Sequence, residues 1–239
     1  MVFAAILAGG KGTRVGTKVP KQFLELDGKM ILLRTLDVFL ESKLFDEIYI
    51  SVNEMWLDFT RQALEENYSP VILSKINLVN GGNERIMSFL NIVEAIKEKY
   101  GVRHEDLVLS HDAVRPFVTK DILVDCIEQT KAHKVAMASV QSADTTYSSQ
   151  TEGFLTSTYD RKKLWLGQTP QGCNMDFLYE VMHSYTEEEL LSMTGTSQLF
   201  INKGINVRVS LGSANNIKIT TMKDIEFSDY MLKKENEEC

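Results

Sequence analysis

Hydrophobic runs rich in valine and isoleucine alternate with helical patterns through the first 140 residues. Apolar runs of strand length take turns with apolar residues at helical spacing, and polar residues separate them. We expect strands at 2–7, 47–52, 76–79, 107–110 and 135–140, and helices at 30–42, 56–66, 84–99 and 120–133. This βαβ alternation predicts an α/β fold with a mainly parallel sheet and helices on both faces.

The alternation stops after residue 140, where short β-rich pieces and turn residues replace the helices. This pattern predicts a β-arm at about residues 141–168. Its large apolar side chains include Tyr147, Phe154, Leu155 and Tyr159. An exposed arm of this kind needs a covering surface, and a second copy of the chain is the simplest one, so we expect a homodimer.

Helical and strand patterns resume beyond the arm. Helices are expected at 175–184 and 187–193, and a strand at 207–211. A final helix begins at Thr221, since Asp224 three residues later completes a capping-box pattern. The chain has no internal repeats or low-complexity linkers, so residues 1–239 are expected to form a single domain with the arm as an appendage.

Length and composition favour a globular protein outside the membrane. At 239 residues and 44% hydrophobic content the chain can bury a substantial core. Its longest apolar runs fall far short of the ~20 residues that a membrane span requires. The first ten residues lack the basic start and long apolar region of a signal peptide. We therefore expect a cytoplasmic protein with no membrane partner.

Cysteines and charge narrow the possible partners. Cys126, Cys173 and Cys239 lie far apart without metal-ligand spacing, so we expect reduced thiols rather than a disulfide framework or a zinc site. A net charge of −7 disfavours binding to a nucleic acid polymer. A small anionic substrate would instead need a local cluster of cations.

A glycine-rich loop that follows the first strand supplies such a cluster, in the stretch AILAGGKGTRVGTKVPKQFLEL at residues 5–26. The dinucleotide fingerprint G-x-G-x-x-G fails because Val15 stands in the third glycine place, and no lysine follows glycines in the Walker arrangement. What remains is a loop whose glycines approach a phosphate chain, with cations at Arg14, Lys18 and Lys21. The alternative is an ordinary turn with solvated lysines.

Two other strand ends carry unusual polar sequence, GGNERIMS at 81–88 and HDAVRPF at 111–117. Ligands of such sheets bind at the carboxyl ends of strands, so all three stretches could line one cleft. Amides around Gly82 at the start of a helix could read the edge of a base, or form a simple turn. Asp112 is placed to hold Mg²⁺ against phosphate oxygens, the alternative being a helix cap or turn.

The sequence says less about the roles of two residues near Asp112. His111 lacks a second histidine or cysteine at ligand spacing, so a structural or hydrogen-bonding role is expected rather than a zinc site. Arg115 is either a salt-bridge partner for the site or a surface charge.

Five motifs together resemble a known family. LAGGKGTR…PKQF, GGNERIMS, HDAVRPF, TPQ and NNIKIT occur in this order over nearly the whole chain. They resemble the cytidylyltransferases that couple CTP to a polyol phosphate, the group containing methylerythritol-phosphate cytidylyltransferase and ribitol-5-phosphate cytidylyltransferase. The resemblance implies a Rossmann-like nucleotidyltransferase fold, a homodimer joined through the β-arm, Mg²⁺ as cofactor, and release of pyrophosphate.

The resemblance also implies roles for individual residues. The CTP-binding set is Leu7, Ala8, Gly9, Gly10, Gly12, Gly81, Gly82, Asn83, Arg85, Ser88 and Asp112, and Asp112 would also bind the metal. The polyol-phosphate set is Arg115, Asp144, Thr145, Arg161, Thr169, Thr194 and Lys218, with Thr194 reaching across the dimer interface. The catalytic set is Arg14, Lys21, Arg161 and Lys218. This chemistry suits a cationic site, because the attacking phosphate oxygen is already ionised and the barrier is largely repulsion between polyanions.

The motifs favour ribitol 5-phosphate as the acceptor, which would feed teichoic acid or capsule polymers. HDAVRPF, GQTPQ and KITT look more like the ribitol-phosphate enzymes, and Asn215 stands where the methylerythritol enzymes carry an aspartate. Gly195 departs from both patterns, and 2-C-methyl-D-erythritol 4-phosphate is the alternative acceptor. A noncatalytic nucleotide-binding regulator is a further alternative, although Arg14 and Lys21 would be needless in a sensor. The displaced third glycine weakens an NAD-dependent oxidoreductase.

Overall fold

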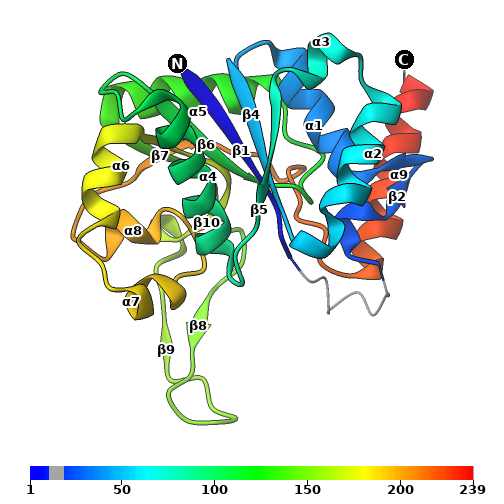
Figure 1. Cartoon of the computed structure of the whole chain (residues 1–239). Coiled ribbons are helices and arrows are strands. Elements are labelled where there is room, and N and C mark those ends of the chain that lie inside the picture. The colour runs from blue at the N-terminus through cyan, green and yellow to red at the C-terminus, as the bar shows by residue number, and fades with distance from the viewer. Residues whose placement is uncertain (11–18, 239) are drawn as a thin grey trace.

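The computed structural model describes residues 1–10 and 19–238, the last four by backbone alone. A seven-stranded sheet forms the centre of this described part (Figure 1), in the order β11-β7-β10-β6-β1-β4-β5. Its strands are β1 (Val2–Ala8), β4 (Glu47–Val52), β5 (Ile76–Asn80), β6 (Leu107–Asp112), β7 (Val135–Gln141), β10 (Trp165–Asn174) and β11 (Arg208–Leu211). Neighbouring strands are parallel except at β10, which is antiparallel to both β6 and β7. The prediction of a mainly parallel sheet is confirmed.

Helices cover both faces of the sheet. They are α1 (Ile31–Ser42), α2 (Leu57–Asn67), α3 (Pro70–Leu73), α4 (Arg85–Tyr100), α5 (Lys120–His133), α6 (Met175–Met182), α7 (Glu187–Leu191), α8 (Gln198–Ile201) and α9 (Met222–Glu238). Short 3-10 turns occupy Lys21–Phe23, Glu54–Trp56 and Arg161–Lys163, and β2 (Glu25–Leu26) pairs with β3 (Lys29–Met30). No helix in the described ranges is both long enough and apolar enough to cross a membrane.

The two faces follow from the twofold alternation of side chains along β1. Ala4 and Ile6 point into one hydrophobic core, which contains the buried side chains of α1 and α5. Phe3 and Ala5 point into a second core, which contains those of α4, α6 and α8. Because both faces are buried, β1 reads as a continuous apolar run.

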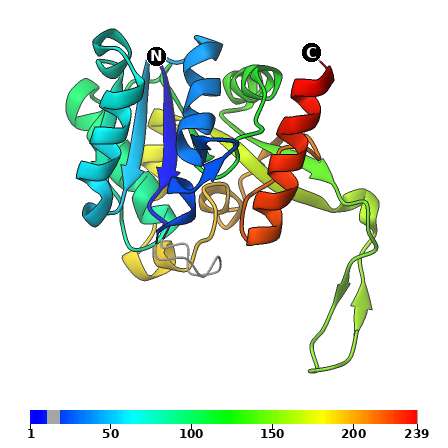
Figure 2. The same ribbon diagram turned by 90° about the vertical axis from the view of Figure 1, so that its right-hand side faces the viewer.

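A β-hairpin extends away from the sheet, as predicted (Figures 1 and 2). Its strands β8 (Tyr147–Ser148) and β9 (Ser157–Thr158) are antiparallel. Phe154 and Leu155 at its tip are 69% and 72% exposed. The arm therefore presents apolar surface to solvent within one chain.

The main correction to the predicted elements is β10. The arm was expected to continue to residue 168, but the chain re-enters the sheet at Trp165 and runs between β6 and β7 to Asn174. The stretch WLGQTPQGCN shows no alternation, and its proline sits at a register shift between Gly167 and Gln171 where the ladder is interrupted. The sequence of β10 therefore lacks the alternation of apolar and polar residues by which a strand is recognised.

The capping box predicted for the last helix is confirmed. The Thr221 amide donates to the Asp224 carboxylate at 2.8 Å, and the Asp224 amide donates to the Thr221 hydroxyl at 3.4 Å. This reciprocal pair fixes the start of α9, which packs Ile225 against Ile219 in a third apolar cluster.

Candidate active site

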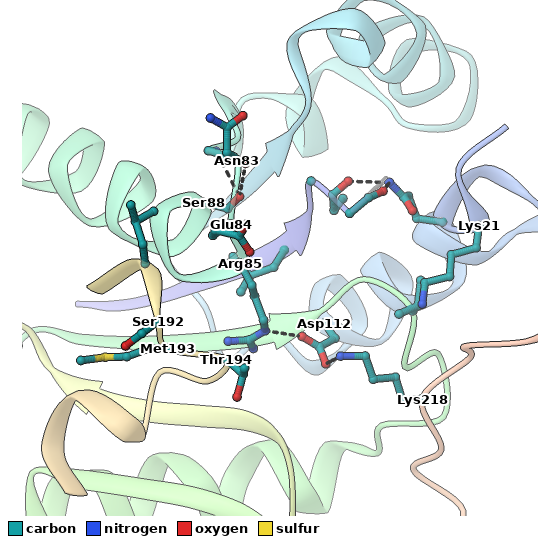
Figure 3. Close-up of a pocket in the computed structure, with 18 residues that line it drawn as sticks. Lys21, Asn83, Glu84, Arg85, Ser88, Asp112, Ser192, Met193, Thr194 and Lys218 are labelled. Carbon is teal, nitrogen blue, oxygen red and sulfur yellow. Dashed lines mark hydrogen bonds and ion pairs between the residues drawn. The ribbon is translucent and has the colours of Figure 1, made fainter. Parts of the chain in front are cut away.

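A cavity of about 500 Å³ opens at the carboxyl ends of β1, β5 and β6 (Figure 3). This volume lies in the range of small-molecule sites, about 300–1,000 Å³. Its lining consists of Leu7, Ala8, Gly9, Gly10, Lys21, Gln22, Gly82, Asn83, Glu84, Arg85, Ser88, Asp112, Val114, Leu191, Ser192, Met193, Thr194 and Lys218. The prediction that three polar strand ends share one cleft is confirmed for the described residues.

Close backbone approach explains the glycine at the end of β1. A Cβ at Gly9 would lie 3.0 Å from the Ser88 hydroxyl oxygen on α4. The Gln22 amide nitrogen donates to the carbonyls of Ala8 and Gly10, at 2.6 and 3.0 Å. These contacts fix the point where the chain leaves β1 and enters the glycine-rich loop.

The turn between β5 and α4 forms the opposite wall. A Cβ at Gly82 would lie 2.4 Å from Cβ of Met87, so this position requires glycine. The Gly82 amide donates to Ser88 Oγ at 3.1 Å, and the Gly81 amide donates to the Val52 carbonyl at 2.7 Å. Contrary to the expectation of exposed amides at the glycines, both groups are therefore already paired.

The free donors of this wall lie one step further along the chain. Within the described residues, the backbone N–H groups of Asn83 and Glu84 have no intramolecular acceptor. They precede the first turn of α4, whose N-terminus carries a partial positive charge. This edge of the cavity is therefore suited to an acceptor-rich group.

Asp112 is the centre of charge in the cavity. Its carboxylate oxygens lie 2.9 Å from Arg85 Nε and 2.9 Å from Lys218 Nζ, which approach it from two sides (Figure 3). Arg115 Nε lies 3.6 Å away. Burial alone would raise the pKa of Asp112, but the three cations hold that pKa well below its usual range. The carboxylate is therefore ionised.

Arg115 is buried, which decides between its two predicted roles. Its guanidinium contacts Asp112 and donates from Nη1 to the Asn216 carbonyl at 2.7 Å. Burial lowers its pKa, although the Asp112 charge opposes that shift. Arg115 is thus an ion-pair partner of the site rather than a surface charge.

A second cavity of about 290 Å³ adjoins the first and shares Arg85, Asp112, Thr194 and Lys218 with it. Its other lining residues are Arg115, Met137, Gly167, Gln168, Thr169, Gln171, Gly195, Ser197 and Gln198. Most of these carry neutral amide or hydroxyl groups. The charged groups of the second cavity gather around Asp112, where Arg115 joins the shared Arg85 and Lys218, and the rest of its lining is uncharged.

The loop that separates the two cavities is held by one side chain. Gln198 Oε1 accepts from the amides of Thr194 and Gly195, at 2.6 and 3.1 Å, and from the Thr194 hydroxyl at 3.2 Å. A Cβ at Gly195 would have Gln171 as its nearest neighbour, at 3.8 Å. The cavity thus has room beside Gly195, and Thr194 lines both cavities of its own chain.

Some predicted site residues lie elsewhere. Arg14 and Gly12 fall outside the described residues. Asp144, Thr145 and Arg161 are exposed on the arm side of the chain and line neither cavity. Arg161 donates from Nη1 to the Ala143 carbonyl at 3.4 Å. One chain alone therefore brings the core residues together but leaves the arm residues apart from them.

Sequence reasoning missed several lining residues. Those of the first cavity are Gln22, Glu84, Val114, Leu191, Ser192 and Met193, and those of the second are Met137, Gly167, Gln168, Gln171, Gly195, Ser197 and Gln198. Gln22 stands beside Lys21 in PKQF, which was a usable signal. Glu84 and Val114 likewise stand inside GGNERIMS and HDAVRPF. The others come from residues 191–198, from Met137 on β7 and from β10, whose position in the sheet the sequence pattern did not reveal.

Comparisons with known proteins agree with this geometry. Residues 2–234 match the family model described as IspD, 2-C-methyl-D-erythritol 4-phosphate cytidylyltransferase. Ribitol-5-phosphate cytidylyltransferase of Streptococcus pneumoniae serotype 2 is 34% identical over 236 residues, which cover 98% of this chain and 100% of that protein.

Solved structures give the same result. The chain superposes with a TM-score of 0.80 and 28% identity on 4-diphosphocytidyl-2C-methyl-D-erythritol synthase from Anaerococcus prevotii, covering 97% of this chain and 96% of that one. For 2-C-methyl-D-erythritol 4-phosphate cytidylyltransferase from Francisella tularensis the TM-score is 0.78 and the identity 31%, with 96% and 98% covered. The predicted Rossmann-like nucleotidyltransferase fold is confirmed.

Proposed function

The chain belongs to the IspD family of cytidylyltransferases, and from this premise we propose that it transfers the cytidylyl group of CTP to ribitol 5-phosphate. It is a nucleotidyltransferase, and its family acts on CTP and a phosphorylated sugar alcohol. The observation that carries the ribitol assignment is the 34% identity to the pneumococcal ribitol-5-phosphate enzyme over 98% of this chain and 100% of that protein. The products would be CDP-ribitol and pyrophosphate, for teichoic acid or capsule polymers.

The two adjoining cavities suit the two substrates. CTP would occupy the first cavity, with its base at the turn between β5 and α4 and its phosphates near Lys21 and Lys218. The polyol phosphate would place its phosphate at the shared cationic wall and its hydroxyls against the amide and hydroxyl groups of the second cavity. This arrangement brings the acceptor phosphate towards the α-phosphorus of CTP.

The reaction needs positive charge rather than a general base. An acceptor phosphate oxygen forms the bond to the α-phosphorus, the bond from that phosphorus to the β-phosphate oxygen breaks, and pyrophosphate leaves. Lys21 and Lys218 would stabilise the negative charge on the oxygens of the transferred phosphoryl group and on the leaving pyrophosphate. Arg14, which lies outside the described residues, would contribute to the same stabilisation.

Enzymes of this family generally depend on a divalent metal, and Asp112 fits Mg²⁺. The described residues contain no group of three or more His, Cys, Asp or Glu side chains that could enclose a metal. A single ionised carboxylate at the junction of the cavities suits Mg²⁺, which binds through one or two carboxylates, substrate phosphates and water. When bound, Mg²⁺ would neutralise phosphate charge, and Asp112 would hold it against the triphosphate.

The turn between β5 and α4 predicts the choice of base. A backbone N–H that faces N3 of cytosine would oppose the N3–H of uracil, so donors at Asn83 and Glu84 favour cytosine. We expect kcat/KM for CTP to exceed that for UTP by at least about tenfold, or about 1.4 kcal/mol. Ser88→Ala removes the hydrogen-bond partner of the Gly82 amide and so loosens this turn. It should lower the ratio of kcat/KM for CTP to kcat/KM for UTP.

The matched control is Ser192→Ala, which removes a hydroxyl from another wall of the same cavity and should leave the ratio unchanged. Equal use of CTP and UTP by the wild-type enzyme would sink the base-reading assignment.

Pyrophosphate release from CTP tests the proposed function. Ribitol 5-phosphate and 2-C-methyl-D-erythritol 4-phosphate are offered separately, and kcat/KM is compared. We expect ribitol 5-phosphate to be preferred by at least about tenfold. Preference for the methylerythritol substrate would support the alternative, which the family model and the superposed structures favour. CTP binding without turnover of any polyol phosphate would instead indicate a nucleotide-binding regulator.

A further inference from the structure

His111 is completely buried on β6 next to Asp112, and the proposed reaction does not use it. Its ring lies against Phe39, with 5.1 Å between the ring centroids. Both ring nitrogens are engaged, since Nε2 lies 3.1 Å from the Arg115 carbonyl oxygen and Nδ1 lies 3.0 Å from Thr169 Oγ1. A histidine enclosed in this way has no nitrogen left for a substrate.

The partners fix which nitrogen carries the proton. The Arg115 carbonyl can only accept, so Nε2 is the protonated nitrogen and Nδ1 accepts from the Thr169 hydroxyl. Thr169 Oγ1 in turn accepts the amide of Asp112 at 3.2 Å.

The network joins three separate segments at the second cavity. His111 bonds to the turn that ends at Arg115 and to β10 at Thr169. Asn216 completes the link, because its side-chain nitrogen donates to the Thr169 carbonyl at 2.8 Å and its carbonyl accepts from Arg115 Nη1 at 2.7 Å. Arg115 and Thr169 both line the second cavity, whereas neither lines the first.

We propose that His111 is a positioning residue for the acceptor: through its two ring nitrogens it sets the places of Arg115 and Thr169 in the second cavity. It does not touch the substrate and is not a general base. The proposal rests on the proposed function only in taking the second cavity as the acceptor side.

Three substitutions separate this role from a purely structural one. His111→Leu keeps an apolar side chain of similar bulk but loses both hydrogen bonds. His111→Asn retains an acceptor near Nδ1, and His111→Gln retains a donor near Nε2. The control is Leu109→Ala, which disturbs the same strand and the same core. A leucine side chain forms no hydrogen bond, so this change breaks none to Arg115 or Thr169.

The measurements are kcat, KM for each substrate, and thermal unfolding. His111→Leu is expected to raise the KM for the polyol phosphate by about tenfold or more while the KM for CTP changes by less than about threefold. His111→Asn and His111→Gln should each recover part of the loss, and Leu109→Ala should lower Tm without separating the two KM values. An unchanged acceptor KM in folded variants, or an equal rise in both KM values, would overturn the proposal.

The acceptor used is whichever polyol phosphate the wild-type enzyme turns over best. A different acceptor from ribitol 5-phosphate therefore counts against the proposed function and leaves the test of His111 intact.

Discussion

Lys21→Ala is expected to lower kcat by about 100-fold or more while changing the KM for CTP far less. Lys21 is 9% exposed and lines the first cavity with Lys218 (Figure 3). It opens a 3-10 turn whose Phe23 ring packs against Trp56 and Phe59, at 5.0 and 5.2 Å between centroids, so its backbone is firmly placed. A charge directed at the developing negative charge acts mainly on the transition state.

The measurement is steady-state kinetics at saturating acceptor, together with CTP binding by calorimetry. Lys29→Ala is the matched control, because Lys29 pairs with Asp37 and lines neither cavity. Loss of such a partly exposed pair costs ~0–1 kcal/mol and should leave kcat unchanged. A Lys21→Ala enzyme that binds CTP poorly but turns over normally at saturation would contradict the catalytic assignment.

Mixing two inactive variants, Arg161→Ala and Lys21→Ala, is expected to restore about a quarter of wild-type activity. Arg161 lies in the 3-10 turn before β10 and lines neither cavity of its own chain. The arm extends away from the body (Figure 2) and bears exposed Phe154 and Leu155. We infer that the arm docks on a second copy and delivers Arg161 to the acceptor phosphate of that copy.

The expected fraction follows from random pairing of subunits. Half of the dimers are mixed, and each mixed dimer contains one site with both Lys21 and Arg161 intact. The control mixture pairs Lys21→Ala with Lys218→Ala, whose residues line the same cavity of one chain, so mixing should restore nothing. If Arg161 makes only a surface contact, Arg161→Ala alone costs little. If confirmed heterodimers of the first mixture stay inactive, Arg161 serves its own subunit.

The spacing of hydrophobic residues predicted most of the fold. The polar residues at the carboxyl ends of the strands predicted much of the candidate site. The alternation along β1 and the helical spacing of α1, α4 and α5 are local signals, because each reflects burial against one sheet. Asp112 could be identified from its sequence because the ends of parallel strands gather at one edge. These features depend on residues close to one another in the chain.

The second cavity could not be predicted from the sequence, because it is built by contacts between segments that lie far apart in the chain. Thr169 reaches Asp112 only because β10 inserts between β6 and β7, and WLGQTPQGCN does not look like a strand. Gly195 was noticed only as a departure from related sequences. The three hydrogen bonds by which Gln198 fixes the loop of Thr194 and Gly195 were not predicted. The pairing of Arg115 with Asp112 and Asn216 likewise required the folded arrangement.

The place of β10 also governs the order in which the molecule can fold. Within the sheet, β7 and β11 connect to β6, β1, β4 and β5 through β10, which comes later in the chain than the strands on either side of it. A nascent chain that ends before Trp165 lacks both neighbours of β7, which are β10 and β11, and one neighbour of β6. Long-range pairing of this kind is slow to form, because loop closure precedes the contacts that reward it. Insertion of β10 and juxtaposition of Asp112 with Thr169 are thus one late event, in which this part of the site and the centre of the sheet form together.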